Sequence, residues 1–96
     1  MTDDRQVLAI YPGSFDPITL GHEDVARRTL RITDRLIVAV AHTATQSKTN
    51  LFTVSERLEM LGEVFSDEPR IEVAEFQGLL VEFAKRRNAQ MVVRGL

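Results

Sequence analysis

Four side chains in the sequence are candidates for binding a phosphate group: Ser14, His22, Lys48 and Arg94. Lysine and arginine carry full positive charge, and arginine can hold a phosphate through two parallel hydrogen bonds. A serine hydroxyl and a histidine ring nitrogen can each donate a hydrogen bond to a phosphate oxygen. Cysteine is absent, which excludes a disulfide framework, a thiolate metal site and a cysteine nucleophile. The set therefore indicates a site for a phosphorylated ligand.

Two of these side chains share one segment, residues 11–22, which reads Tyr-Pro-Gly-Ser-Phe-Asp-Pro-Ile-Thr-Leu-Gly-His. The segment is too polar and too rich in proline and glycine for a core element, so we expect a loop between a strand and a helix. Gly13 lets backbone N–H groups approach an anion closely. A helix beginning near Gly21 adds unpaired N–H groups and the positive end of its dipole. We interpret the segment as a binding site for the phosphates of a nucleotide.

Each candidate also has a purely structural interpretation. A proline-glycine pair can simply turn the chain, a histidine at a helix N-terminus is usually solvated, and Lys48 or Arg94 can be a surface charge. His42 has no specific neighbour and is interpreted as structural. Asp16 could be a metal ligand, but aspartate before proline is more often a turn former. The sequence contains neither a P-loop nor a Gly-x-Gly-x-x-Gly fingerprint.

Hydrophobic periodicity predicts the element order β-α-β-α-β-α-β. Two strands are continuously apolar and should be buried on both faces, whereas the third alternates and should lie at a sheet edge. The predicted strands are Val7–Ile10, Arg35–Ala41, Ile71–Phe76 and Gln90–Val93, and the predicted helices are Gly21–Thr33, one that follows Thr53, and Leu79–Arg87.

The ends of two predicted helices carry recognisable signals. Thr53 and Glu56 match a capping box, which places the start of the second helix. Pro69 is expected to end that helix, and Asn88 to end the third. The basic triplet Lys85–Arg87 is interpreted as a helix C-terminus favoured by the dipole.

Strands that alternate with helices predict a parallel sheet with right-handed crossovers. Ligands of such sheets bind at the carboxyl ends of the strands. The phosphate-binding candidates all follow predicted strand ends, as does the segment 78–80 after the third strand. Their joint occurrence at one edge favours the functional interpretation over the structural one.

Length and composition indicate one small globular domain over residues 1–96, with 44% apolar and 27% charged residues. A net charge of -2 gives no reason to expect a nucleic acid or a membrane as partner. The polar, acidic start does not resemble a secretory signal, so a cytoplasmic location is the default expectation. The chain stops just as its fourth strand leaves the sheet, and we therefore expect a fragment of a longer fold.

Residues 11–22 resemble the signature of the phosphopantetheine adenylyltransferases, nucleotidyltransferases of coenzyme A synthesis. The ending Thr19-x-Gly21-His22 is similar to that family's version of a wider superfamily motif. Three further segments agree in order and spacing, so the resemblance covers nearly the whole chain. They are Ser47-Lys48 with Phe52-Thr53 and Glu56-Arg57, Gly78-Leu79-Leu80 with Phe83-Ala84, and Arg94-Gly95-Leu96.

The resemblance implies an α/β, doubly wound parallel sheet of nucleotidyltransferase (Rossmann-like) type, with strand order 3-2-1-4-5 and the first four strands present. The chain would be the N-terminal portion of that fold. It also implies adenylyl transfer from ATP to 4′-phosphopantetheine, giving dephospho-coenzyme A and pyrophosphate. Because the family continues beyond the Arg-Gly-Leu segment, we expect little or no turnover from these 96 residues alone.

The same resemblance assigns roles to five residues. Ser14, with the amides of Ser14 and Phe15, would hold the two reacting phosphates near each other. His22 would bind ATP and stabilise the transition state. Lys48 and Arg94 would bind the pantetheine phosphate and neutralise its charge for attack on the α-phosphorus. Catalysis would then depend on positioning and charge stabilisation.

The remaining implied residues and partners concern the ends of the two substrates. Leu79 and Leu80 would line the pantetheine arm, and Gly95 and Leu96 would begin the ATP-binding segment. Mg²⁺ would bind mainly through ATP oxygens. The family forms hexamers, so a homo-oligomer is expected.

Two alternatives remain at this point. The chain could be another cytidylyl- or adenylyltransferase of the superfamily with a different phosphate acceptor, although Lys48 and the segment 78–80 favour pantetheine. It could also be a non-catalytic module that binds one ligand or serves in assembly.

Overall fold

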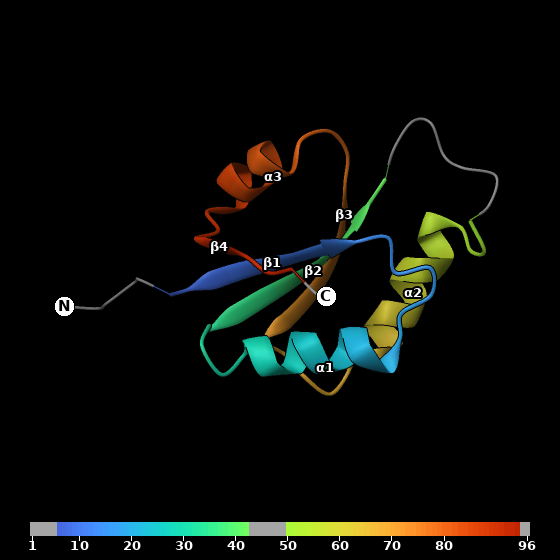
Figure 1. The fold of residues 1–96 in the computed structure, drawn as a ribbon, viewed down its shortest axis with the longest axis horizontal. Coiled ribbons are helices and arrows are strands. Elements are labelled where there is room, and N and C mark those ends of the chain that lie inside the picture. The colour runs from blue at the N-terminus through green and yellow to red at the C-terminus, as the bar shows by residue number, and fades with distance from the viewer. Residues whose placement is uncertain (1–5, 43–49, 95–96) are drawn as a thin grey trace.

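The computed structural model describes residues 6–42 and 50–94, and these form one four-stranded parallel sheet with three helices (Figure 1). The strand order is β3-β2-β1-β4, with every neighbouring pair parallel. The predicted α/β architecture and the edge position of the third strand are confirmed. The elements are β1 (Leu8–Gly13), α1 (Leu20–Thr29), β2 (Arg35–Ala41), α2 (Val54–Val64), β3 (Ile71–Phe76), α3 (Leu80–Arg87) and β4 (Met91–Val92).

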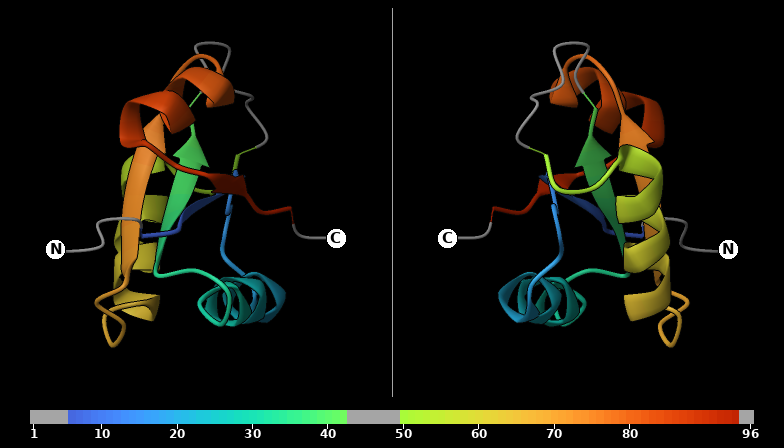
Figure 2. Two further views of the ribbon diagram at one scale, coloured as in Figure 1. Left: turned by 90° about the vertical axis from the view of Figure 1, so that its left-hand side faces the viewer. Right: turned by 90° about the vertical axis from the view of Figure 1, so that its right-hand side faces the viewer.

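Helices cover both faces of the sheet, which makes it doubly wound. Figures 1 and 2 show α3 on one side of the strands and α1 on the other. On the α1 side, the buried residues Val38, Leu61 and Phe65 belong to one apolar cluster that also includes Leu30 of the first helix's C-terminal cap. On the α3 side, a smaller cluster joins Ile37 of β2 to the stacked rings of Phe76 and Phe83. The central strands are therefore buried on both faces, as their continuous apolar runs predict.

The first strand is longer than predicted, because Pro12 and Gly13 continue it instead of ending it. Both residues pair with β2, opposite Ala39 and Val40. The Ile10 carbonyl accepts a hydrogen bond from the backbone N–H of Val93, so the backbone groups of Ile10 face β4. Pro12, two residues later, faces the same side of β1, but the short β4 has already ended there. The missing N–H of proline thus removes no hydrogen bond from the described sheet.

The helix ends differ from the predictions in informative ways. The helix α1 ends at Thr29, because the backbone N–H groups of residues 30–32 bond three residues back instead of four. Thr33, beyond this end, is still buried, and its hydroxyl donates to the Thr29 carbonyl. The helix α2 ends at Val64, well before Pro69, so the proline does not end it.

The other helix signals behave as expected. The capping box of Thr53 and Glu56 is present in both directions. Asn88 adopts a left-handed conformation (φ 60°) at the C-terminus of α3, a position for which asparagine is well suited.

The strand β4 covers only Met91–Val92 and is shorter than the predicted Gln90–Val93. At its start, the side chain of Gln90 accepts the N–H of Leu8. No helix in the described ranges is both long and apolar enough to cross a membrane.

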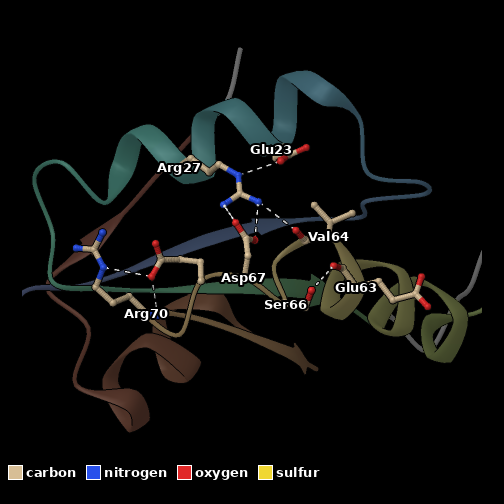
Figure 3. A network of polar contacts seen from close by, with 8 residues as sticks. Glu23, Arg27, Glu63, Val64, Ser66, Asp67 and Arg70 are labelled. Atoms are coloured by element: carbon tan, nitrogen blue, oxygen red, sulfur yellow. Dashed lines mark hydrogen bonds and ion pairs between the residues drawn. The ribbon is translucent and has the colours of Figure 1, made fainter.

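Arg27 connects α1 to the turn after α2 (Figure 3). Its guanidinium donates to the Val64 carbonyl at 3.1 Å and to both carboxylate oxygens of Asp67, at 3.0 and 3.3 Å. It also donates to Glu23 one turn earlier and lies 5.4 Å from the centroid of the Phe65 ring. One side chain thereby fixes the packing of the two helices that cover this face.

We expect the Arg27–Asp67 contact to make stability pH-dependent. The hydrogen bond from Arg27 lowers the pKa of Asp67 below its ordinary value of 3.8. A depressed folded-state pKa stabilises the protein above the unfolded value, and this contribution disappears as the pH falls through the folded value. Asp67→Asn should therefore lower the Tm slightly at pH 7, and this difference should shrink as the pH falls below 3.8. Thermal melts over this range test this, with the exposed Glu59→Gln as control; a constant difference at all pH values would contradict it.

Candidate functional site

A cavity of about 670 Å³ opens at the carboxyl end of β1. Its volume is within the usual range of small-molecule sites. The lining residues come from three parts of the chain: the end of β1 and the loop after it, the start of α1, and the position just after β4. They are Tyr11, Pro12, Gly13, Phe15, Thr19, Gly21, His22, Asp24, Val25 and Arg94. The structure thus brings Phe15, His22 and Arg94 together, although Arg94 lies 72 residues after His22.

The imidazole of His22 is held in one tautomer by the cap of its own helix. Its Nδ1 atom accepts the backbone N–H of Thr19 at 3.0 Å, while the Thr19 hydroxyl accepts the N–H of His22 at 3.2 Å. Because Nδ1 must carry a lone pair to accept, the neutral ring has its proton on Nε2. The Phe15 ring contacts the imidazole edge-to-face, with centroids 5.1 Å apart. His22 therefore offers a single N–H donor from a fixed ring.

This capping arrangement gives a stability prediction. Thr19→Ala removes the hydroxyl that satisfies the His22 N–H, and loss of such a cap lowers the free energy of unfolding by about 1 kcal/mol. Urea denaturation measures this value. Ser66→Ala is the matched control, because its hydroxyl also bonds to a nearby backbone group but lies in an exposed turn. If Thr19→Ala changes the free energy of unfolding no more than the control, the cap makes no special contribution.

The backbone around Phe15 has an uncommon conformation that the sequence does not reveal. Phe15 has φ 47°, in the left-handed region that residues with a Cβ seldom adopt, and its side chain is buried. A Cβ at Gly13 would lie 3.1 Å from the Phe15 ring, so glycine leaves the space that the ring occupies. Strained residues of this kind concentrate at binding sites. The buried ring turns the backbone at the point where the phosphate-binding loop was predicted.

The other predicted site residues lie outside the cavity lining or outside the described residues. Ser14 is exposed and lies between Gly13 and Phe15, which both line the cavity. Leu79 is 65% exposed at the start of α3, and Leu80 packs against the apolar cluster on that face, so neither lines the cavity. Lys48, Gly95 and Leu96 are outside the described residues.

Two residues that sequence reasoning gave no site role connect this loop to the start of α2. Asp16 accepts the backbone N–H groups of Leu51 and Phe52, both at 2.8 Å. Arg57 is 1% exposed and donates to the Ser14 carbonyl at 2.9 Å. The signal for Asp16 was its place before a proline, which was correctly interpreted as structural. Nothing in the local pattern distinguishes Arg57 from a surface arginine.

The polar groups of the cavity favour an anionic ligand. Among the described residues that line the cavity, Asp24 is the only carboxylate, and Arg28 pairs with it at 3.0 Å. Burial raises the pKa of the Tyr11 phenol above its ordinary value of 10.0, so its hydroxyl stays neutral. In the described part of the chain, no three His, Asp or Glu side chains cluster closely enough to hold a metal ion.

Comparison with known proteins identifies the family. The sequence profile described as cytidylyltransferase-like matches residues 10–96. The chain belongs to the cytidylyltransferase-like family. Among solved structures, the lipopolysaccharide core biosynthesis protein from Thermoplasma volcanium GSS1 superimposes on this chain with a TM-score of 0.70. That alignment covers 92% of this chain and 73% of the other, and its 20% identity supports a shared fold only.

Several proteins with the name phosphopantetheine adenylyltransferase are identical to this chain at about half of the aligned positions. The protein from Syntrophotalea carbinolica is 53% identical over 89 residues, which are 93% of this chain and 52% of that protein. The protein from Nitratidesulfovibrio vulgaris strain DP4 is 51% identical over 96 residues, which are 100% of this chain and 50% of its own length. The chain spans about half the length of the curated relatives it matches.

Proposed function

We propose that this chain supplies the catalytic half of a phosphopantetheine adenylyltransferase, which transfers the adenylyl group of ATP to 4′-phosphopantetheine. The identity of 51–53% to proteins of that name carries the proposal. The cavity supports it independently, because a fixed histidine N–H donor and an arginine meet there at the carboxyl end of a parallel sheet.

The proposed reaction is an in-line displacement at the α-phosphorus of ATP. A phosphate oxygen of phosphopantetheine forms a bond to the α-phosphorus. The bond between the α-phosphorus and the oxygen that bridges the α- and β-phosphates breaks, and pyrophosphate leaves with that electron pair. The reaction needs no protein nucleophile. His22, through its Nε2–H, would donate to an oxygen of the pentacoordinate phosphorus, where negative charge develops.

The remaining roles follow the resemblance. Arg94, together with Lys48, would bind the acceptor phosphate, while Ser14 and the neighbouring amides would hold the two phosphates together. Leu79 and Leu80 would line the pantetheine arm. Since Asp24 is the only lining carboxylate, the cavity offers few oxygen ligands for Mg²⁺, and the ion would enter bound to ATP. A homo-oligomer remains part of the proposal.

Two experiments test the function. Calorimetric titration of this chain should detect 4′-phosphopantetheine in preference to glycerol phosphate and nicotinamide mononucleotide, and preference for either of the latter would favour another transferase of the family. Kinetics require a full-length protein, because the chain spans half of its relatives. We define the fusion protein as this chain joined to the part of the Syntrophotalea carbinolica relative that the alignment does not cover. It should release dephospho-coenzyme A and pyrophosphate in equal amounts.

A further inference from the structure

Arg57, at the start of α2, is a buried charge without an ion-pair partner in the described residues. It is 1% exposed, and its hydrogen bonds all go to carbonyl oxygens: Phe52 at 3.1 Å, Thr53 at 3.3 Å and Ser14 at 2.9 Å. Its Nη2 atom is buried with no hydrogen-bond partner among the residues described. Burial of a guanidinium without a carboxylate partner costs several kcal/mol, which its hydrogen bonds to carbonyls offset only in part because one nitrogen stays unsatisfied.

The three carbonyl contacts show what the guanidinium holds together. Phe52 and Thr53 lead into α2, whereas Ser14 lies 43 residues before Arg57, in the loop after β1. Asp16 makes the reverse connection, because this loop residue accepts the N–H groups of Leu51 and Phe52. The two charged side chains thus connect the same two segments, one through carbonyls and the other through amides. Neither Asp16 nor Arg57 lines the cavity.

We propose that Arg57 is a positioning residue for the phosphate-binding loop, and that it also supplies positive potential behind that loop. This inference rests on the proposed function. By holding the Ser14 carbonyl, the guanidinium fixes the direction in which the Ser14 hydroxyl and the next amide face. Its charge lies in a low-dielectric interior where solvent screens it weakly, so it favours an anion bound on the other side of the loop. Both effects raise the affinity for the phosphates of ATP.

Two substitutions at this position separate geometry from charge. Arg57→Lys keeps the charge but loses the fork that reaches three carbonyls, and Arg57→Met loses both. We expect the Kd of the fusion protein for ATP with Mg²⁺ to rise roughly tenfold for Arg57→Lys and more for Arg57→Met, since a tenfold change is about the loss of one hydrogen bond to a charged group. Calorimetry well below the Tm measures this. If Arg57→Met does not fold, Arg57→Lys decides.

The matched control is Arg27→Lys. Arg27 also connects two segments through its guanidinium, but it does not line the cavity or contact the loop after β1. The Arg27→Lys variant should lower the Tm as Arg57→Lys does and change the Kd for ATP by less than about twofold. Unchanged ATP affinity in a folded Arg57→Lys protein would overturn the proposal, and so would an equal loss of affinity in Arg27→Lys.

Two further measurements complete the test. In a double-mutant cycle, the Kd of the double variant Arg57→Lys with Ser14→Ala should rise by less than the product of the two single fold-changes if Arg57 acts through Ser14. A rise equal to that product would contradict this.

Amide hydrogen exchange needs no ligand: the N–H groups of Leu51 and Phe52, which bond to Asp16, should exchange faster in Arg57→Lys and not in Arg27→Lys. If the wild-type fusion protein binds no ATP, the proposed function fails; if exchange is unchanged, the positioning role fails.

Discussion

Replacement of His22 by glutamine should lower the kcat of the fusion protein by roughly 10²–10³, the usual effect of losing one donor to developing negative charge. Glutamine is the ordinary residue at this position of a capping box, so its side chain can accept the Thr19 N–H that the imidazole now accepts. The substitution thus preserves the helix start and removes the Nε2–H donor. The KM values for both substrates should change far less than kcat, because the donor acts mainly on the transition state.

The comparison with alanine separates catalysis from folding. His22→Ala should show the same loss of kcat and also lower the Tm, because it breaks one half of the capping box. His42→Ala is the control, since the sequence has only two histidines and His42 contacts Gln77 and Glu75 outside the cavity. If His22→Gln kept wild-type kcat, His22 would not act on the transition state.

The fold was predictable because its signals are local. The apolar runs of β1 and β2 extend over enough residues to indicate strands buried on both faces, and the alternation in β3 indicates an edge. The errors occur where tertiary contacts decide the outcome. Pro12 continues β1 only because its side of the strand faces past the end of β4. A sequence pattern contains no information about how far a neighbouring strand extends.

The candidate site was predictable in part, for a similar reason. The topology of a parallel sheet places strand ends at one edge, which suffices to bring His22 and Arg94 to one cavity. The left-handed backbone of Phe15 and the buried guanidinium of Arg57 could not be predicted. Both depend on contacts across the fold: Arg57 reaches a carbonyl 43 residues away. Residues that touch a ligand are marked by their chemistry, whereas those that hold them in place look like any other residue of their type.

Removal of the Arg94 side chain should have the other large effect, on the acceptor substrate. Arg94 lines the cavity directly after β4, and none of the ion pairs between described residues involves it. A bidentate guanidinium–phosphate contact is among the strongest hydrogen bonds in proteins, so Arg94→Ala should lower kcat/KM for 4′-phosphopantetheine roughly 10²–10³-fold in the fusion protein. The KM for ATP should change less than about threefold, because Arg94 is assigned to the acceptor phosphate.

Arg94→Lys tests whether geometry or charge dominates. Lysine keeps the positive charge but presents a single ammonium group instead of two parallel donors. It should recover about tenfold of the lost kcat/KM, the equivalent of one charged hydrogen bond. Arg86→Ala, an exposed arginine in the last turn of α3, should leave both substrates unaffected. If Arg94→Ala raised the KM for ATP as much as the KM for 4′-phosphopantetheine, Arg94 would bind the nucleotide as well, and its assignment to the acceptor phosphate alone would be wrong.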